Sequence, residues 1–346
     1  MPRSFPLPAE YVPDLGRPLR WGVVGTGGIA QTVMSDLMLV PDAELVGVLS
    51  RTAERGAALA GELAVPYDRE RPTPAVFQDI NEMLPEIDIL YVATPHAQHV
   101  EPALAALESG TAVLSEKAIT VHYRDAVELV EASQRNQTFL MEAVWMRFNP
   151  LHVKLRELIS TGVLGDVLRV VADFSFLFPY VPTHRLFDPL QGGGALLDMG
   201  PYPVGLVQCL MGDPDSVAVH GSLSPNGVDD NATLLMRYPN GAAGIATCTM
   251  RLDGPRTATI MGTSGSWVEL HANALRPHRM TLHKPDAISQ VFEIAIEGSG
   301  YVPQLREVQM RVRNGEIESP VMPHRDTLSI MRIFEDALAE LGVSYP

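Results

Sequence analysis

Tyr202 and Lys117 are two residues whose types could together move a proton. A phenol has an ordinary pKa of about 10, too high for efficient acid–base chemistry near neutral pH, but a nearby ammonium stabilises the phenolate and lowers that pKa. Asp198 stands four residues before Tyr202, so the two share a face if the segment is helical. Such a group suits oxidation of an alcohol. The alternative is that Tyr202 packs half-buried and Lys117 is a solvated lysine at a strand end.

Two prolines flank Tyr202 and bear on how its segment folds. Three glycines, 192–194, open the segment, and apolar residues at helical spacing follow it. Pro201 and Pro203 either kink one helix or let a helix start near Pro201, because proline suits the first helical turn and disrupts the interior. Both arrangements can leave Asp198 near Tyr202.

A glycine turn near the N-terminus indicates a nucleotide site. The apolar run 21–24 meets this turn, and a helical pattern continues to Val40. Strand, glycine turn and helix in this order form the phosphate-binding start of a dinucleotide-binding unit. The helix N-terminus offers free N–H groups to the phosphates. The alternative is a structural turn in an ordinary α/β protein. The residues expected at the cofactor are Gly25, Thr26, Gly27, Gly28 and Ile29.

The end of the second expected strand favours NADP, with NAD as the alternative. An NAD site usually places Asp or Glu there to bind the ribose 2′-OH. This chain has Ser50, Arg51 and Thr52 instead. A hydroxyl beside a guanidinium suits a 2′-phosphate, which arginine binds through a two-pronged contact. Arg51 could otherwise be only the solvated start of the next helix.

Further candidates follow the later strands. In a doubly wound sheet the carboxyl ends of the strands line the ligand site. Residues at these ends, expected beside the nicotinamide half of the cofactor, are Thr94, Pro95, His96, His99, Glu116 and Lys117. The two histidines lack the spacing of a metal site, so no metal is expected, and helix capping or packing would explain them equally well. Trp145 and Arg147 either line the substrate pocket or pack where the two domains join.

Composition places the chain among globular proteins. Its 346 residues are 46% hydrophobic, and the net charge of −15 argues against nucleic acid or an anionic membrane as partner. No apolar run approaches the ~20 residues of a membrane span, and the N-terminal stretch has no signal-peptide core. Cys209 and Cys248 show no metal-type spacing and fit buried thiols in a reducing cytoplasm.

The order of elements predicts two domains. Strands alternate with helices over residues 19–141, which predicts an α/β Rossmann domain with a doubly wound parallel sheet. Residues 142–326 predict an α+β domain with an open, mostly antiparallel sheet. Residues 1–18 hold five prolines and are expected to form an extended arm, loose or packed on a neighbouring subunit. A final helix, in 327–346, could return to the first domain.

Expected elements can be given by residue number. First-domain strands are expected near 20–24, 44–50, 88–93, 112–115 and 138–141, and helices near 28–40, 52–63, 97–109 and 122–135. In the second domain a helix is expected at 151–160 and strands near 167–176, 215–223, 230–237, 242–250, 256–262 and 266–271. Between them the stretch 64–87 is ambiguous: residues 65–67 could form a short strand and 76–84 a helix.

These motifs in this order resemble the glucose–fructose oxidoreductase, inositol dehydrogenase and MocA-type oxidoreductase family over about residues 20–346. The matching pieces are Gly25–Ala30, Ala93–His96 with His99, Glu116-Lys117 and Gly193–Gly200. The segment Glu142–Phe148 and Tyr202 are most similar to the dimeric dihydrodiol dehydrogenase branch. The resemblance implies that Tyr202 is the acid/base with Lys117 as its partner. It also implies subunits that pair through the open sheet, as a homodimer or homotetramer.

One position departs from that family. Ala118 follows Lys117 where relatives usually carry a proline, which often fixes a cis peptide bond. The hypothesis is therefore an NADP-dependent oxidoreductase that transfers a hydride between nicotinamide and a secondary alcohol or carbonyl of a sugar or cyclic diol, with Asp198 orienting Lys117 or Tyr202. The alternatives are a cofactor-binding sensor that has lost turnover and, less favoured, a methyltransferase using S-adenosylmethionine.

Overall fold

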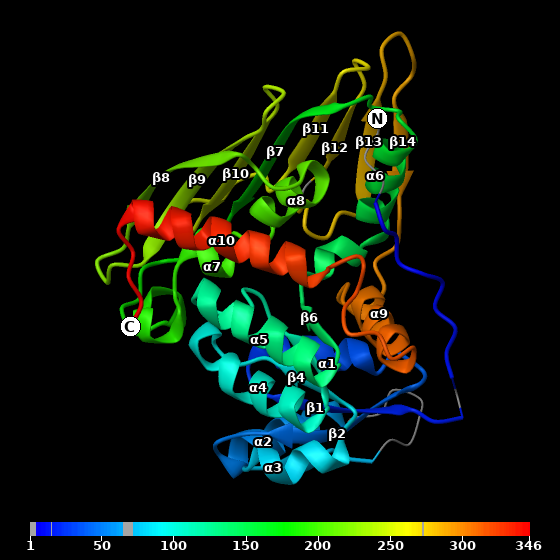
Figure 1. Ribbon diagram of the computed structural model, residues 1–346, viewed down its shortest axis with the longest axis vertical. Helices are drawn as coiled ribbons and strands as arrows, with labels where there is room; N and C mark the ends of the chain where they lie inside the picture. The colour runs from blue at the N-terminus through cyan, green and yellow to red at the C-terminus, as the bar shows by residue number, and fades with distance from the viewer. Residues whose placement is uncertain (1–4, 15, 65–71, 272) are drawn as a thin grey trace.

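The computed structural model describes residues 5–14, 16–64, 72–271 and 273–346. Figure 1 shows a sheet with helices on both faces in the lower half and a larger twisted sheet in the upper half. A long helix near the C-terminus runs between the two halves. The predicted Rossmann domain and open second sheet are confirmed.

The first sheet is parallel, in the order β3-β2-β1-β4-β5-β6. Its strands are β1 (Leu19–Val24), β2 (Ala43–Leu49), β3 (Ala75–Phe77), β4 (Ile89–Val92), β5 (Ala112–Ser115) and β6 (Leu140–Glu142). Central strand β4 is buried at every position because helices cover both faces. The order reverses between β1 and β4, so a ligand is expected at the carboxyl ends of these strands. We call this edge the carboxyl edge.

Short connections join these strands to their covering helices. The helices of this half are α1 (Gly28–Leu37), α2 (Ala53–Leu63), α3 (Ile80–Met83), η1 (Leu84–Glu86), η2 (His96–Gln98), α4 (Val100–Ser109) and α5 (Tyr123–Asn136). The stretch 76–84, expected as a helix, instead begins as strand β3 and becomes helical only at Ile80. Asp79 caps that helix by accepting from the Asn81 N–H, which fixes the boundary. The strand expected at 65–67 lies outside the described residues.

The second sheet has eight strands in the order β14-β13-β12-β11-β7-β10-β9-β8. Its strands are β7 (Val167–Ser175), β8 (Ser216–Leu223), β9 (Asp229–Arg237), β10 (Ala243–Thr249), β11 (Ala258–Gly262), β12 (Trp267–Leu270), β13 (Arg279–His283) and β14 (Gln290–Glu293). Neighbours are antiparallel except β7 and β10, which are parallel. Buried and half-exposed residues alternate along β9 because helices cover one face. The described residues leave the other face of this sheet uncovered.

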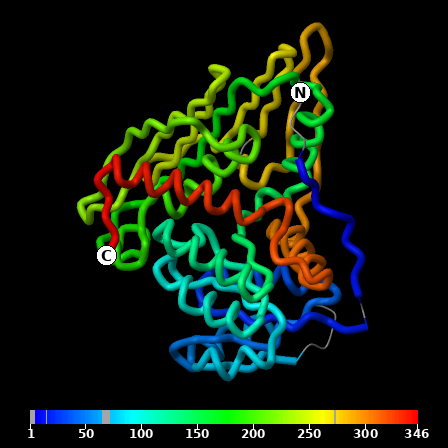
Figure 2. The backbone as a smooth tube through the Cα atoms, viewed as in Figure 1, coloured from blue at the N-terminus to red at the C-terminus, as the bar shows by residue number. Residues whose placement is uncertain are grey.

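The helices of the second half both cover that sheet and reach the first. They are η3 (Trp145–Phe148), α6 (Pro150–Ser160), η4 (Arg185–Phe187), η5 (Pro189–Gln191), α7 (Ala195–Asp198), α8 (Pro203–Met211), α9 (Val302–Arg313) and α10 (His324–Leu341). The last of these contacts α5 of the Rossmann layer as well as β8 of the open sheet. Figure 2 shows it running between the two halves.

The sequence reasoning missed α9, β13 and β14. Helix α9 packs on the Rossmann half: the Trp21 indole N–H donates to Gln309 Oε1 (2.9 Å), whose amide donates to Asp42 O (2.7 Å). These bonds join residues more than 260 positions apart. The first sheet is therefore completed by a helix that follows the second sheet in the chain.

The N-terminal arm packs on its own chain, which corrects the expectation of a loose arm or one on a neighbouring subunit. The Tyr11 hydroxyl donates to the Asp42 carboxylate, and the Arg306 guanidinium lies over the Tyr11 ring, 5.6 Å from its centroid. Arg313 binds both Asp14 and Asp42. The described part of the arm thus lies along α9 and the amino-terminal edge of the Rossmann half (Figure 2).

Among the described residues no helix is long and apolar enough to cross a membrane. The same residues hold no group of three His, Cys, Asp or Glu side chains that could bind a metal ion. Cys209 and Cys248 are buried free thiols, as predicted.

Candidate active site

The glycine turn follows β1 directly and is shaped for a close ligand. Gly25 has φ +105°, and a Cβ on it would lie 2.5 Å from Ala93 O, so only glycine fits there. Gly27 and Gly28 are exposed, and a Cβ on either would meet nothing within 4 Å. Gly27 is the N-cap of α1 and gives that helix no side-chain cap. The free N–H groups at this N-terminus can therefore hold a diphosphate.

The end of β2 presents Ser50, Arg51 and Thr52 beside that turn. Ser50 is buried, and its hydroxyl accepts from the Thr52 N–H (3.3 Å). Arg51 and Thr52 are exposed, and α2 begins immediately after them at Ala53. A guanidinium at the end of the strand next to β1 lies where a dinucleotide's adenosine ribose is expected. This placement agrees with a role for Arg51 toward a 2′-phosphate.

His96 and His99 lie buried after β4 and bind backbone carbonyls. His96 Nδ1 lies 2.7 Å from Gly192 O and Nε2 lies 3.1 Å from Lys117 O. Burial lowers the pKa of His96 to about 3, so its ring is neutral and donates through one nitrogen only. The shorter contact, from Nδ1 to Gly192 O, favours Nδ1 as that donor. His99 Nε2 lies 2.8 Å from Thr94 O, and burial lowers its pKa too. Both rings connect the β4 end with neighbouring loops.

Thr94 and Pro95 shape the same turn. The Thr94 hydroxyl donates to Gln98 O (3.0 Å), and Pro95 is the N-cap of η2. Both residues are half-buried at the carboxyl edge, so their outward surfaces remain able to contact a cofactor.

Lys117 joins the end of β5 to the second half of the chain. Its ammonium donates to Asp198 O, lies 3.8 Å from Asp198 Oδ1 and stands 5.1 Å from the centroid of the Tyr202 ring. The predicted group of Lys117, Asp198 and Tyr202 is therefore assembled in space. The Lys117–Ala118 peptide bond is cis, although alanine occupies the position.

The two carboxyl groups at this site have pKa values shifted in opposite directions. Burial would raise the pKa of Asp198, but the Lys117 and Arg185 cations lower it well below its ordinary value. Burial raises the pKa of Glu116, only partly opposed by Lys117 and by the Tyr91 hydroxyl that donates to Glu116 Oε1 (2.5 Å). Asp198 is therefore ionised at neutral pH. Glu116 is buried and accepts a hydrogen bond from the Tyr91 hydroxyl.

Tyr202 is buried between the two helices of its segment. Helix α7 ends at Asp198 and α8 begins at Pro203. One of the two expected arrangements had a helix that starts near Pro201, and the observed helix starts two residues later. Burial, and then the nearby Glu116 carboxylate, raise the pKa of Tyr202 far above its ordinary value. The expected lowering of that pKa by Lys117 is not seen: the ammonium lies over the ring, 5.1 Å from its centroid, and donates to Asp198 O.

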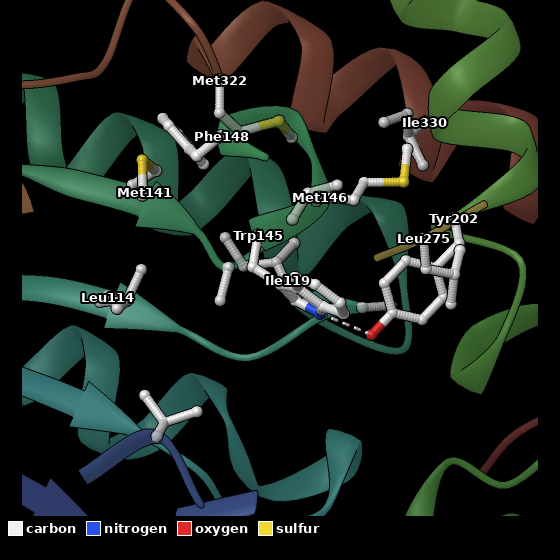
Figure 3. Packing of buried hydrophobic residues seen from close by; sticks show 14 of the residues in the cluster. Leu114, Ile119, Met141, Trp145, Met146, Phe148, Tyr202, Leu275, Met322 and Ile330 are labelled. Carbon is white, nitrogen blue, oxygen red and sulfur yellow. Dashed lines mark hydrogen bonds between the residues drawn. The ribbon is translucent and has the colours of Figure 1, made fainter. Parts of the chain in front are cut away.

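Aromatic side chains surround Tyr202. The Trp145 indole N–H donates to Tyr202 Oη (3.0 Å), as the dashed line in Figure 3 shows. Phe174 lies edge-on to Tyr202, with ring centroids 5.3 Å apart, and Tyr301 lies 4.8 Å from the Trp145 ring. A substrate beside Tyr202 would therefore meet apolar ring faces.

The comparisons with known proteins match the chain over both halves. Residues 19–144 match the oxidoreductase family with an NAD-binding Rossmann fold, and residues 152–268 match the GFO/IDH/MocA C-terminal domain. The D-xylose 1-dehydrogenase (NADP(+)) of Hypocrea jecorina is 33% identical, with 95% of this chain and 93% of that protein covered. The chain belongs to the GFO/IDH/MocA oxidoreductase family.

Other members of the GFO/IDH/MocA family agree with this assignment. The trans-1,2-dihydrobenzene-1,2-diol dehydrogenase of Mus musculus is 32% identical over 95% of this chain and 98% of its own length. The crystal structure of an aldose-aldose oxidoreductase from Caulobacter crescentus superposes with a TM-score of 0.82 over 94% of this chain and 98% of that one, at 21% identity. The last comparison shows a shared fold. The chain is thus an NAD(P)-dependent oxidoreductase of this family.

Arg147 does not join the group, which corrects its expected place in the substrate pocket of this GFO/IDH/MocA protein. Its side chain is buried and donates to Asp326 Oδ2 (2.6 Å), Gln208 Oε1 (2.9 Å) and Val321 O (3.2 Å). A guanidinium so bound links η3 to α8 and α10. Of the two interpretations, packing between the domains is the one the structure shows for Arg147.

Arg185 and Tyr301 are members of the site that the sequence reasoning missed. Arg185 Nη1 donates to Asp198 Oδ1 (3.0 Å) and is half exposed at the mouth of the group. Tyr301 precedes α9, and its N–H, like that of Ser299, donates to Asp36 of α1. The glycines at 298 and 300 before an apolar helical pattern were the available signal for Tyr301. No sequence pattern indicated Arg185, although its partner Asp198 lies only 13 residues later in the chain.

Proposed function

We propose that this chain is an NADP-dependent dehydrogenase acting on a secondary alcohol of an aldose or a cyclic diol. The observation that carries the proposal is the assembled group of Lys117, Asp198 and Tyr202 beside the carboxyl edge of a dinucleotide-binding sheet. The names of the two relatives above supply the substrate classes, an aldose and a cyclic diol.

The glycine turn and the strand ends would hold the cofactor. Gly27, Gly28 and the N-terminus of α1 receive the diphosphate, and Ser50 with Arg51 receive the 2′-phosphate. Thr94 and Pro95 would lie at the nicotinamide half. When bound, the nicotinamide accepts or gives the hydride, which is chemistry of the cofactor itself.

The residues of the group manage the proton. Tyr202 holds its proton at neutral pH in the free protein, because its pKa is raised, and is ready to give it to a carbonyl oxygen. In the direction of oxidation the phenol must first release its proton to solvent, and the phenolate oxygen then takes the proton of the substrate hydroxyl. Lys117 lies beside that position and is oriented by its bond to Asp198 O. Asp198 is held in turn by Arg185.

Replacement of Arg51 tests the cofactor assignment. We expect Arg51→Ala to weaken NADPH binding about 10- to 100-fold, because charge-assisted contacts to a phosphate are lost, and to change NADH binding less than about twofold. Fluorescence titration with both cofactors measures this. Arg135→Ala, an exposed arginine at the end of α5, is the control and should change neither. Equal losses for NADPH and NADH would contradict the 2′-phosphate assignment.

A screen of aldoses and cyclic diols with NADP then tests the substrate class. Tight NADPH binding without turnover on any of these compounds would favour the sensor alternative. Turnover of one class identifies the class. The two cysteines, Cys209 and Cys248, are buried free thiols, which supports the proposal that the protein acts in a reducing cytoplasm.

The open face of the second sheet is the proposed contact between subunits, in a homodimer or homotetramer. On β10, Gly244 and Ala246 are buried beneath helices while Ile245 between them is half-exposed on the other face. A hollow over β11 and β12 of the same sheet is lined by Thr259, Met261 and Trp267. Apolar side chains on an otherwise open face favour burial against a second copy.

A charge in the middle of that face should separate the subunits. We expect Ile245→Asp to weaken association at least tenfold, because an unpaired carboxylate would be buried at the contact. Light scattering across micromolar concentrations measures the molar mass. Ile288→Asp, at an isoleucine that is 96% exposed in the loop before β14, is the control and should leave the mass unchanged. An unchanged mass for both variants would exclude this face.

A further inference from the structure

The contact between Trp145 and Tyr202 fixes the direction of a proton. An indole N–H can only donate, so Tyr202 Oη is the acceptor in the 3.0 Å contact of these two buried side chains. Within the described residues, Tyr202 Oη has no other hydrogen bond. The single proton of the phenol must therefore point away from Trp145. Figure 3 shows the indole nitrogen and the phenol oxygen facing each other.

Trp145 is itself held firmly in this position. It begins η3, just after β6, and its ring lies 4.8 Å from the Tyr301 ring. Gly300, with φ +101°, brings the chain so close that a Cβ there would lie 3.5 Å from Trp145 Cζ3. The Tyr301 loop is tied by its N–H groups to the Asp36 carboxylate on α1. The Trp145 indole thus packs against a loop that is hydrogen-bonded to α1, the helix that begins at the glycine turn.

We propose that Trp145 is a positioning residue that orients the Tyr202 hydroxyl toward substrate and stabilises its oxygen when the proton has left. This inference rests on the proposed function, because it assigns a partner to the acid/base of that reaction. After the phenol proton has left, the negative oxygen still accepts the hydrogen bond from the indole N–H. Hydrogen bonds to a charged oxygen are stronger than those to a neutral one.

The surroundings of Tyr202 make this donor more important. Burial and the Glu116 carboxylate both disfavour the phenolate, whereas the bond from Trp145 favours it. Lys117 lies over the Tyr202 ring, and its ammonium donates a hydrogen bond to Asp198 O. Trp145 is accordingly the neighbour whose polar atom meets the reacting oxygen directly.

Removal of the indole N–H without change of shape tests the proposal. Benzothienylalanine at position 145 replaces the N–H by sulfur and keeps two fused rings, and Trp145→Phe is the simpler second variant. We expect kcat for oxidation of the best substrate in the screen to fall about tenfold, with KM changed less than about twofold. The midpoint of the acidic limb of the kcat–pH profile should rise by about one unit, because the phenolate has lost a donor.

Trp21→Phe is the matched control. It removes another buried indole N–H, the donor to Gln309 Oε1, and should lower stability while leaving the kcat–pH midpoint unchanged. A variant at 145 with an unchanged kcat and profile, or with raised KM alone, would overturn the proposal and make Trp145 a substrate wall. Full activity of Tyr202→Phe would overturn the proposed function instead.

A measurement without turnover covers the case in which no substrate is found. In protein labelled with ¹³C at tyrosine Cζ, the Tyr202 resonance is assigned by its loss in Tyr202→Phe. We expect it to move when the N–H at 145 is replaced by sulfur, since Cζ responds to hydrogen bonding at Oη. An unmoved Tyr202 resonance would show that the bond does not form in solution.

Discussion

Tyr202→Phe is expected to lower kcat about 10²- to 10⁴-fold, the range typical of a lost general acid or base. The phenylalanine keeps the ring between Phe174 and Trp145 and removes only the oxygen that exchanges the proton. Cofactor binding should be unchanged, because the glycine turn and Arg51 lie elsewhere on the sheet. Steady-state kinetics with the best substrate, and a fluorescence titration with NADPH, measure the two effects.

Tyr238→Phe provides the comparison for this loss. The Tyr238 hydroxyl donates to Gly212 O (3.1 Å) at the end of α8, outside the Lys117 group, so its removal should cost about 1 kcal/mol of stability and leave kcat within about twofold. If Tyr202→Phe keeps kcat within about threefold of the parent, Tyr202 is not the acid/base and another proton donor must act.

Local sequence patterns were sufficient to place the predicted cofactor residues at one edge of the first sheet. The geometry of two short stretches, Gly25–Ala30 and Ser50–Thr52, depends on residues nearby in the sequence. The alternation of strands and helices then places both stretches at the same edge of the sheet. Lys117 and Tyr202 were placed by the resemblance and are confirmed as neighbours in space. Their motifs lie at the ends of elements that the hydrophobic pattern locates well.

The parts that could not be predicted depend on contacts distant in the sequence. Arg147 is buried because Asp326, 179 residues later, pairs with it, and a charged residue after a strand otherwise suggests a ligand site. The pKa of Tyr202 is raised by burial and by the Glu116 carboxylate, while the Lys117 ammonium lies over the ring and donates to Asp198 O. Strands β13 and β14 are only five and four residues long, so their hydrophobic pattern is weak.

Asp229→Asn is expected to change how stability depends on pH. Asp229 is fully buried on β9, where Oδ2 accepts from the Leu196 N–H (2.7 Å) at the start of α7 and Oδ1 has no partner among the described residues. Burial, together with the Asp230 charge, raises the pKa of Asp229 to about 7. The folded protein therefore holds this proton more tightly than the unfolded chain, whose aspartate has a pKa of about 3.9.

The sign of the effect follows from that difference. Between pH 4 and pH 7 the folded state binds more protons at this site, so the site's contribution to stability is full below pH 4 and is lost as pH rises through 7. Three units correspond to about 4 kcal/mol. An asparagine cannot ionise, so the free energy of unfolding of Asp229→Asn should gain about that much relative to the parent between pH 4 and pH 8, measured by urea unfolding.

Asp229→Ala separates the charge from the hydrogen bond. The alanine removes both the ionisable group and the acceptor for the Leu196 N–H, so its stability should follow the pH dependence of Asp229→Asn but lie about 1–3 kcal/mol lower. Parallel curves for the parent and Asp229→Asn from pH 4 to pH 8 would show that Asp229 does not titrate in this range. Since α7 carries Asp198, a parent curve that falls while the Asn curve stays level would tie the stability of the catalytic segment to one buried carboxyl group.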